Sequence, residues 1–374
     1  MPKKKTKIAY GFKYFWLNLL GQERQVRVLN FLNKTYALRK TITFNCFIRD
    51  FKRVLVILPE KPYEVLLTQR CIAALKEHKA DMIVDVIAES TNKDIIKSNP
   101  YVDGGIFYSA SEFFYNHPAF KELLAVIRDK SYDACFLMKD EVNPLDLLLS
   151  AMSMAPLRIG FTGKNVSPFI NLSIRPKQGT VYEGDKYEAL FKTIGVRMSR
   201  SKLRWNIPKA TEKDVEGVLV EAGYKIEQPL IGLNISSSIN GRTLPASAIK
   251  SLIQELSKLG NAEIILFYSS QKESSLMKEL EGLKKNIVPI PEDQVSFAAA
   301  FVYKCDIIIS LNNLIYQLAI MLNRPVIGLF EENENQRWAL VQENKFEVVI
   351  APRLKNIDTA EITAKATRIL VPTN

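Results

Sequence analysis

Two adjacent asparagines, Asn312 and Asn313, stand between apolar runs that have the lengths of a strand and a helix. The run before them, Asp306–Ser310, is short and rich in β-branched residues, and the run after them, Leu318–Leu322, is compact. A second run of strand length follows at Pro325–Phe330. This order predicts a strand, a polar turn, a helix and a parallel strand. The turn of such a unit presents backbone N–H groups to an anion, so we predict an anion-binding turn.

The elements that must position this turn alternate along most of the chain. From Arg53 onward, apolar runs of strand length alternate with amphipathic runs of helix length. A basic, irregular stretch at Arg197–Pro208 separates a first series from a second. We therefore predict an α/β fold with two Rossmann-like, doubly wound sheets that face each other across a cleft. The predicted parts are an N-terminal extension (residues 1–50), a first domain (51–205), a second domain (206–352) and a C-terminal helix (353–374).

The composition is that of a soluble globular protein, with 47% hydrophobic and 24% charged residues among 374. A chain of this length fits two domains better than one. The cysteines show no CxxC spacing, which predicts reduced, cytosolic thiols; they are Cys46, Cys71, Cys135 and Cys305. The two histidines, His78 and His117, lie far apart and argue against a zinc site. No apolar run approaches the roughly 20 residues that span a bilayer, and we identify no cleavable signal.

All of the excess positive charge lies at the N-terminus. Residues 1–53 contain 13 Lys or Arg and two acidic residues, a net charge of +11, which equals the net charge of the whole chain. Apolar residues recur there at helical spacing: Phe12, Phe15, Trp16, Leu19 and Leu20. This basic amphipathic pattern predicts that residues 1–40 dock on an anionic membrane surface. The alternatives are a helix packed on the first domain and a nucleic-acid-binding segment. Because the rest of the chain has no net charge and offers no second basic surface, we predict no nucleic-acid partner.

Several segments occur in the order and spacing of one known family. They are FKRVLVILPEKPYEVLLTQRCIAALKE from Phe51, and then Ser98–Ser109, Tyr132–Lys139, Arg158–Phe161 and Leu233–Pro245. With the turn at Asn312 and the pair Arg337 and Trp338, they resemble bacterial heptosyltransferases, glycosyltransferase family nine, from about Lys52 to Pro352. The resemblance implies a GT-B-like fold. It also implies transfer of a sugar from a nucleotide-diphosphate donor, with ADP-heptose as the candidate, to a lipid-linked glycan such as a lipopolysaccharide core.

The turn departs from the family's pattern, which reads Asn-Asp-Ser/Thr-Gly-x-x-His. The matching residues here are Leu311, Asn312, Asn313, Leu314 and, three positions further on, Gln317. Leu314 has a side chain where glycine allows the backbone to approach a pyrophosphate. Asn312 can hydrogen-bond a sugar hydroxyl but lacks the negative charge of the family's aspartate. Gln317 can also form hydrogen bonds but lacks the imidazole ring of the family's histidine.

The resemblance also implies roles for residues outside the turn. Glu64 stands where the family has the aspartate that is the proposed base; alternatively, Glu64 only interacts favourably with the helix dipole. Arg242 is the best candidate for the diphosphate, because arginine presents a charged planar fork to phosphate oxygens, and the alternative is an ordinary surface arginine. Glu273 is the candidate that holds a ribose. The predicted donor-binding residues are Ser236, Ser237, Ser238, Arg242, Glu273, Asn312, Asn313, Gln317 and Arg337.

Two functions of different class follow. The first is an inverting glycosyltransferase of heptosyltransferase type, cytoplasmic and peripherally associated with the inner membrane. It implies no metal and no cofactor besides the nucleotide-sugar substrate, because the cleft loops lack an Asp-x-Asp motif that would hold Mg²⁺. The second is a catalytically degenerate family member that binds a glycan, a nucleotide or a protein. The altered turn favours the second function. The carboxylate, the arginine and the order and spacing of segments that the chain retains favour the first function, which we predict.

Overall fold

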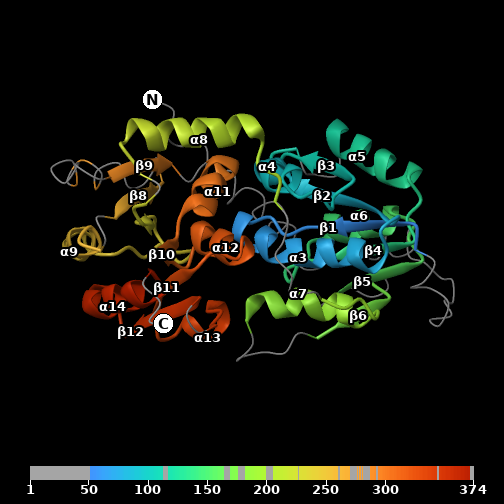
Figure 1. Ribbon diagram of the computed structural model, residues 1–374. Coiled ribbons are helices and arrows are strands. Elements are labelled where there is room, and N and C mark those ends of the chain that lie inside the picture. The colour runs from blue at the N-terminus through green and yellow to red at the C-terminus, as the bar shows by residue number, and fades with distance from the viewer. Residues whose placement is uncertain are drawn as a thin grey trace. The chain divides into compact units, whose positions relative to one another are not determined.

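The computed structural model divides into two compact units, each built around one six-stranded parallel sheet (Figure 1). It describes residues 51–370 apart from 113–116, 164–168, 176–181, 199–204, 226, 260–261, 270–275, 277, 279, 281–286, 292–293 and 343–344. Within these, the first unit takes residues 51–175 and 186–198, and the second takes 182–185 and 205–370. The two sheets confirm the predicted pair of doubly wound α/β sheets. The N-terminal extension lies outside the described residues.

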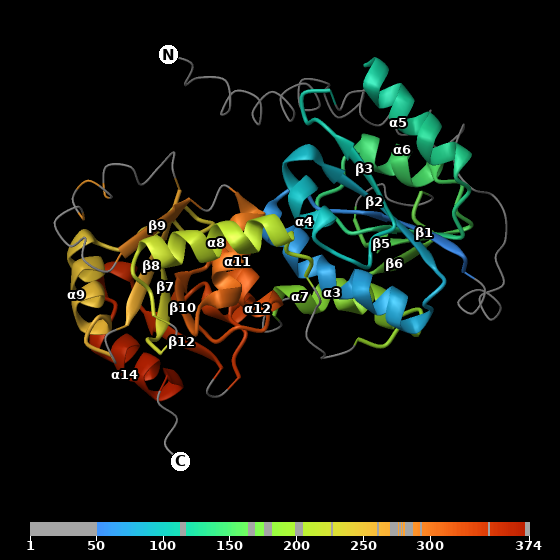
Figure 2. The ribbon, with the colours of Figure 1, turned by 45° about the horizontal axis from the view of Figure 1, so that its top comes forward.

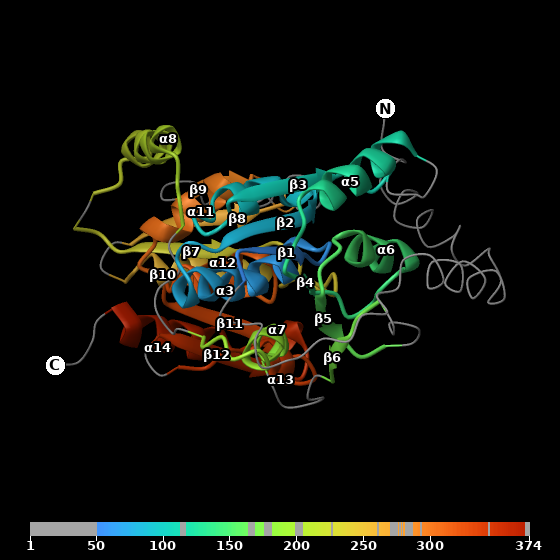
Figure 3. The same ribbon diagram turned by 90° about the vertical axis from the view of Figure 1, so that its right-hand side faces the viewer.

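The first sheet has the strand order β3-β2-β1-β4-β5-β6, and Figure 3 shows the six strands side by side in this order. The strands are β1 (Arg53–Ile57), β2 (Ile83–Glu89), β3 (Gly104–Tyr108), β4 (Ala134–Leu137), β5 (Leu157–Phe161) and β6 (Leu172–Ile174). The helices of this part are α3 (Pro62–His78), α4 (Lys93–Lys97), α5 (Pro118–Asp129), α6 (Pro144–Met152) and α7 (Glu183–Lys192). The chain adds β2 and β3 on one side of β1 and then β4 to β6 on the other. The strand order therefore reverses between β1 and β4.

Alternate residues of β1 face opposite layers of helices, as the pleat of a strand requires. Leu55 and Ile57 belong to the core that α5 and α6 cover. On the other face, Phe136 of β4 stacks on Phe191 of α7 with ring centroids 4.5 Å apart. Figure 2 shows α5 and α6 on one side of these strands and α3 and α7 on the other. Because both faces are covered, every β1 residue after Arg53 is buried.

The second sheet has the strand order β12-β11-β10-β7-β8-β9. Its strands are β7 (Leu230–Asn234), β8 (Glu263–Tyr268), β9 (Ile287–Pro291), β10 (Ile307–Leu311), β11 (Val326–Glu331) and β12 (Phe346–Ala351). Its helices are α8 (Lys209–Glu221), α9 (Ala246–Leu256), α11 (Val295–Lys304), α12 (Leu314–Met321), α13 (Asn335–Trp338) and α14 (Thr359–Leu370). The order reverses between β7 and β10. Most of the helix that the sequence predicts at Gln271–Leu283 lies outside the described residues.

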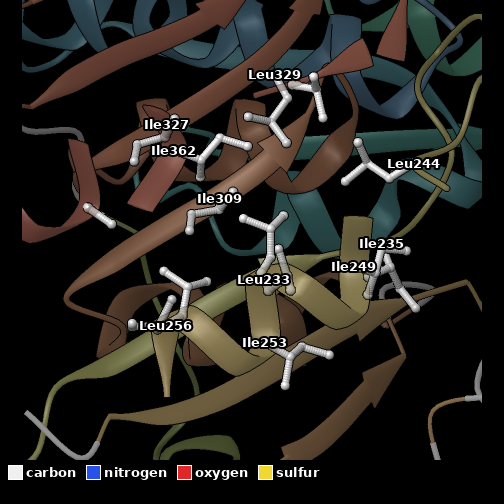
Figure 4. Packing of buried hydrophobic residues seen from close by; sticks show 14 of the residues in the cluster. Leu233, Ile235, Leu244, Ile249, Ile253, Leu256, Ile309, Ile327, Leu329 and Ile362 are labelled. Carbon is white, nitrogen blue, oxygen red and sulfur yellow. The ribbon is translucent and has the colours of Figure 1, made fainter. Parts of the chain in front are cut away.

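One face of the second sheet packs on α9 and α14, which contact each other. Figure 4 shows Leu233 and Ile309 of the sheet close to Ile253 of α9 and Ile362 of α14. The other face carries α11 and α12, and α8 packs on α11. A Cβ at Gly328 of β11 would lie 2.6 Å from the Tyr316 ring, so glycine lets α12 approach the sheet closely.

The three described cysteines are free thiols, in agreement with the predicted reduced state, and all three are buried. Cys71 lies on α3, Cys135 on β4 and Cys305 directly after α11. Burial raises the pKa of each thiol, to about 11 for Cys135. The sequence did not predict β6, which has only three residues and no fully buried position.

Candidate functional site

The reversal of strand order in the second sheet brings two polar loops together. Ligands of open α/β sheets bind beside the carboxyl ends of strands at such a reversal. β7 ends at Asn234 and β10 at Leu311, and the two strands are neighbours. Ile239 in the loop after β7 donates its N–H to the Asn312 carbonyl at 2.8 Å. The predicted loop Ser236–Arg242 and the predicted Asn312 turn therefore lie side by side.

A buried amide contact joins the ends of β7 and β10. Asn234 Nδ2 donates to Asn313 Oδ1 at 2.8 Å and to Ser310 Oγ at 3.1 Å. The Ser236 N–H donates to Asn234 Oδ1 at 2.8 Å. Asn313 Nδ2 lies 3.3 Å from the Ser236 carbonyl oxygen and 3.5 Å from that of Ser237, and donates to both. These side chains position the backbone of the serine loop.

Asn313 is also the N-cap residue of α12. Its Oδ1 accepts the backbone N–H of Ile315 at 3.1 Å and that of Tyr316 at 3.5 Å. Asparagine is among the residues preferred at this position, because its side chain pairs N–H groups that the helix leaves unsatisfied. The prediction that this turn presents free N–H groups is therefore wrong for these two. An anion at the turn either binds beside the cap or displaces it.

A tight turn closes the loop after β7 and carries Arg242. The Gly241 N–H donates to the Ser238 carbonyl at 2.8 Å, and Gly241 has a φ of 77°, which glycine adopts without strain. Ser238 N donates to the Arg242 carbonyl at 2.8 Å, and Arg242 N donates to Ser238 Oγ at 3.2 Å. Ser238 thus shapes the turn that presents the arginine.

Three predicted residues carry buried polar atoms that no described residue pairs. Asn312 is 1% exposed, and neither its Oδ1 nor its Nδ2 has a hydrogen-bond partner among the described residues. The same holds in this part of the chain for Ser236 Oγ and Gln317 Nε2. The other amide atom of Gln317, Oε1, accepts from the Tyr182 hydroxyl at 3.0 Å. An unpaired buried polar group costs about 1–3 kcal/mol, so these groups indicate a place that a polar ligand completes.

Both predicted cations of the second unit are paired with carboxylates. Arg242 Nη1 contacts Glu331 Oε2 at the end of β11. Arg337 makes a two-pronged contact with Glu183, with Nε 2.5 Å from Oε2 and Nη2 3.0 Å from Oε1. The Arg337 guanidinium also lies 5.6 Å from the centroid of the Trp338 ring. The charge available to a phosphate is therefore lower than the sequence suggested.

Glu64 lies in the first turn of α3, in the first unit. Its carboxylate is 3.6 Å from Nζ of Lys61, and the side chains are 23% and 59% exposed, respectively. Burial by itself lowers the pKa of Lys61, but Glu64 raises it overall. A surface pair of this kind contributes little to stability. Its role as base and its role at the helix dipole both stay predictions.

A charged cluster that was not predicted from the sequence lies at the reversal in the first sheet. Lys139 follows β4 and is 5% exposed. Its Nζ lies 2.6 Å from Asp146 Oδ1 and 3.5 Å from Oε1 of Glu60, which follows β1. The signal in the sequence was a lysine directly after the apolar run Ala134–Met138. Its partner Glu60 lies far away along the chain, and only the fold brings the two together.

Glu273 lies outside the described residues, so the predicted ribose contact stays a prediction. Within the parts of the chain that the structure describes, no group of three or more His, Cys, Asp or Glu side chains is arranged to hold a metal ion. In the same parts, no helix is both long and apolar enough to cross a bilayer.

The two-sheet architecture is similar to that of solved heptosyltransferases. E. coli ADP-heptose LPS heptosyltransferase II is 18% identical, with a TM-score of 0.69 over 85% of this chain and 98% of that one. A family 9 glycosyltransferase from Veillonella parvula is 18% identical, with a TM-score of 0.71 over 87% and 92%. E. coli heptosyltransferase WaaC with ADP is 15% identical, with a TM-score of 0.67 over 85% and 99%. These likenesses establish a GT-B-like fold.

The sequence itself decides the family. The model of glycosyltransferase family 9 (heptosyltransferase) matches residues 121–366, well over half of the chain. A search of curated proteins finds no match. The chain belongs to glycosyltransferase family 9, as the resemblance predicted.

The two asparagines of the turn should respond differently to substitution. Asn313→Ala removes the cap of α12 and leaves Asn234 without its partner, so we expect a loss of about 2–3 kcal/mol in the free energy of unfolding. Asn312→Leu removes an unpaired buried amide at similar volume, so stability should stay within about 0.5 kcal/mol or rise. Urea unfolding of both variants measures this. A large loss in Asn312→Leu would mean that its amide has a structural partner.

Proposed function

We propose that the protein is a glycosyltransferase of heptosyltransferase type, which transfers a sugar from a nucleotide-diphosphate donor to a lipid-linked glycan such as a lipopolysaccharide core. ADP-heptose is the candidate donor. The observation that carries the proposal is a set of buried polar groups on Asn312, Ser236 and Gln317 that have no hydrogen-bond partner among the described residues. They lie at the edge of the second sheet where ligands of this fold class bind. Family membership supports the reaction class.

In the proposed complex, the nucleotide diphosphate lies between the Ser236–Arg242 loop and the Asn312–Leu314 turn. Arg242 turns from Glu331 to the diphosphate, because two phosphate groups offer the guanidinium more negative charge than one carboxylate. Asn312 and Gln317 provide neutral amide donors and acceptors for sugar hydroxyls. The proposed role of Arg337 is a further contact with the diphosphate, in competition with Glu183.

The ion pair between Arg242 and Glu331 gives a two-sided test of the donor site. Arg242→Ala should weaken binding of ADP by about 1.5–3 kcal/mol, the usual worth of a hydrogen bond to a charged group. Glu331→Gln should strengthen it, because the competing carboxylate is gone while Oε1 can still accept the Leu354 N–H, at 3.0 Å in the wild type. The exposed neighbour Glu332 supplies the matched control, Glu332→Gln. Calorimetric titration measures the affinity of the wild type and of the three variants for ADP. Equal affinities in all four proteins would remove Arg242 from the site.

The proposed chemistry is a single displacement at the anomeric carbon of the donor. The acceptor hydroxyl oxygen forms the new bond to that carbon while the bond to the diphosphate oxygen breaks, and the diphosphate leaves with the electron pair. The hydroxyl proton passes to a carboxylate, for which Glu64 is the proposed base. Hydrogen-bond donors of the loop after β7 stabilise the charge that develops on the diphosphate.

Glu64→Gln should abolish transfer while leaving the affinity for ADP nearly unchanged, because only the proton transfer is lost. Measurements of product formation and of ADP binding on the same preparation check this. Full activity in Glu64→Gln would assign the base to another residue.

The second candidate function is binding of a nucleotide, a glycan or a protein without transfer. Two observations favour it: the Asn313 side chain occupies N–H groups of α12, and Arg242 and Arg337 are both paired with carboxylates. ADP release from ADP-heptose separates the two functions. Binding of the donor without turnover, in the presence of a range of core acceptors, would favour the second.

We further propose that residues 1–40 hold the protein on the cytoplasmic face of the inner membrane, where lipid-linked acceptors are presented. Each Lys or Arg near an anionic surface contributes about 1 kcal/mol, and raised salt screens this attraction. Deletion of residues 1–40 should abolish sedimentation with anionic liposomes at low salt and leave the two units folded. Equal sedimentation of the truncated and full-length proteins would rule out membrane docking through this segment.

A further inference from the structure

The loop after β7 passes over the end of β10. The strand order β11-β10-β7 places β10 between the other two strands. The loop leaves the sheet at the end of β7, and its far side contacts Glu331 and Glu334, which lie at and just beyond the end of β11. Between these points the Ile239 N–H donates to the carbonyl of Asn312, which follows β10, at 2.8 Å. We call residues Ser238–Arg242 the strap, because they span the sheet edge from β7 to β11.

Two glutamates hold the strap from the side of β11. Arg242 Nη1 contacts Oε2 of Glu331. Asn240 Nδ2 donates to Oε1 of Glu334, which is 8% exposed. Both glutamates are fixed in turn, because Glu331 Oε1 accepts the Leu354 N–H at 3.0 Å and the Glu334 N–H donates to the Glu331 carbonyl at 2.9 Å. The strap is therefore fastened to a rigid edge by hydrogen bonds to charged groups.

The strap is a compact turn with few polar contacts to its surroundings. The Ser238 N–H donates to the Arg242 carbonyl and the Gly241 N–H to the Ser238 carbonyl, both at 2.8 Å. The chain is anchored separately on each side, by the bonds from Asn313 to the preceding carbonyls and by Leu244, which is buried. Among the described residues, the polar contacts that join the strap to the rest of the unit are the three given above. Breaking these three contacts lets the turn swing away without unfolding its neighbours.

The residue beneath the strap shows what the closed position costs. Asn312 is 1% exposed, and neither atom of its amide has a hydrogen-bond partner among the described residues. The strap covers it, since the loop crosses the end of β10 and Ile239 contacts the Asn312 backbone. A buried amide without partners costs free energy, which contact with water or a polar ligand recovers. The two glutamates therefore hold the strap shut against this cost.

We infer that the strap is a lid over Asn312 and that Glu331 and Glu334 latch it shut until a ligand displaces them. Opening the strap exposes the Asn312 amide and releases Arg242. That the ligand is a nucleotide diphosphate rests on the proposed function, whereas the latch does not. Glu331 takes the contact that the proposed complex gives to the diphosphate, so the closed latch and the bound donor exclude each other.

Hydrogen exchange of the full-length protein, measured by mass spectrometry at residue resolution, tests the latch without a ligand. The Ile239 amide hydrogen exchanges when its bond to Asn312 opens. Asn240→Ala and Glu331→Gln each remove one half of the latch, so exchange at Ile239 should become at least about tenfold faster, the worth of a hydrogen bond to a charged group. Thr243→Ala, at an exposed position beside the strap, is the control and should exchange like the wild type.

The Ile308 amide of β10 separates opening of the strap from unfolding of the unit. It donates to the Pro325 carbonyl at 2.9 Å inside the sheet, and its exchange should keep the wild-type rate in all three variants. Where Asn240→Ala destabilises the whole unit, Glu331→Gln decides, because glutamine can still accept the Leu354 N–H. Unchanged exchange at Ile239 in both latch variants, or an equal increase at Ile239 and Ile308 in both, overturns the inference.

ADP separates the latch from the proposed function. In stopped-flow binding, the association rate of ADP should rise in Asn240→Ala and Glu331→Gln by about the factor seen for exchange at Ile239, and Thr243→Ala should match the wild type. Faster exchange with an unchanged association rate overturns the inference, because the strap then does not control access. Faster exchange in a protein that binds no ADP supports the latch and refutes the proposed donor site. ADP binding with unchanged exchange in both latch variants does the reverse.

Discussion

The carboxamide of Asn313 holds together the parts of the second unit that meet where the strand order reverses. It bonds the end of β7 through Asn234, the serine loop through the Ser236 carbonyl, and the start of α12 through the Ile315 N–H. The group is buried, so loss of one partner leaves another polar atom unpaired at a cost of about 1–3 kcal/mol. The position of the loop that presents Arg242 thus depends on the N-cap side chain of α12, which follows a different strand.

The two units meet the same topological constraint with different chemistry. In the second, neutral amides bridge the neighbouring strands β7 and β10; in the first, Lys139, Asp146 and Glu60 bridge β1 and β4 with charges. An amide link keeps its hydrogen bonds at any pH, whereas a charged link depends on every member staying ionised. At the second edge Arg242 is paired with Glu331, and at the first Lys139 is paired with Asp146 and Glu60.

Most of the fold follows from the sequence, because apolar runs of two lengths alternate and each sheet is covered on both faces. The proximity of the loop after β7 and the Asn312 turn follows too, since polar residues after neighbouring parallel strands lie at the same carboxyl edge of a sheet. The cap at Asn313 could have been predicted from the residue type. Asparagine is preferred at the N-cap position, where its side chain pairs the N–H groups that would otherwise be free. The pairing of Arg242 with Glu331 could not, because the two are distant along the chain and either could face solvent. The same holds for Glu60 and Lys139, whose contact exists only once β1 and β4 are neighbours.

The buried cysteines have a consequence for how the opening of each unit can be followed. A thiol reacts as its thiolate, and burial both raises the pKa of Cys71, Cys135 and Cys305 and shields them from reagents. Alkylation of these positions therefore reports transient exposure rather than surface chemistry. Cys71 and Cys135 belong to the first unit and Cys305 to the second. With Cys46 replaced by serine, the remaining cysteines report the local unfolding of the two units separately. The alkylation rate of each, relative to that of an exposed thiol, gives its opening equilibrium without any introduced cysteine.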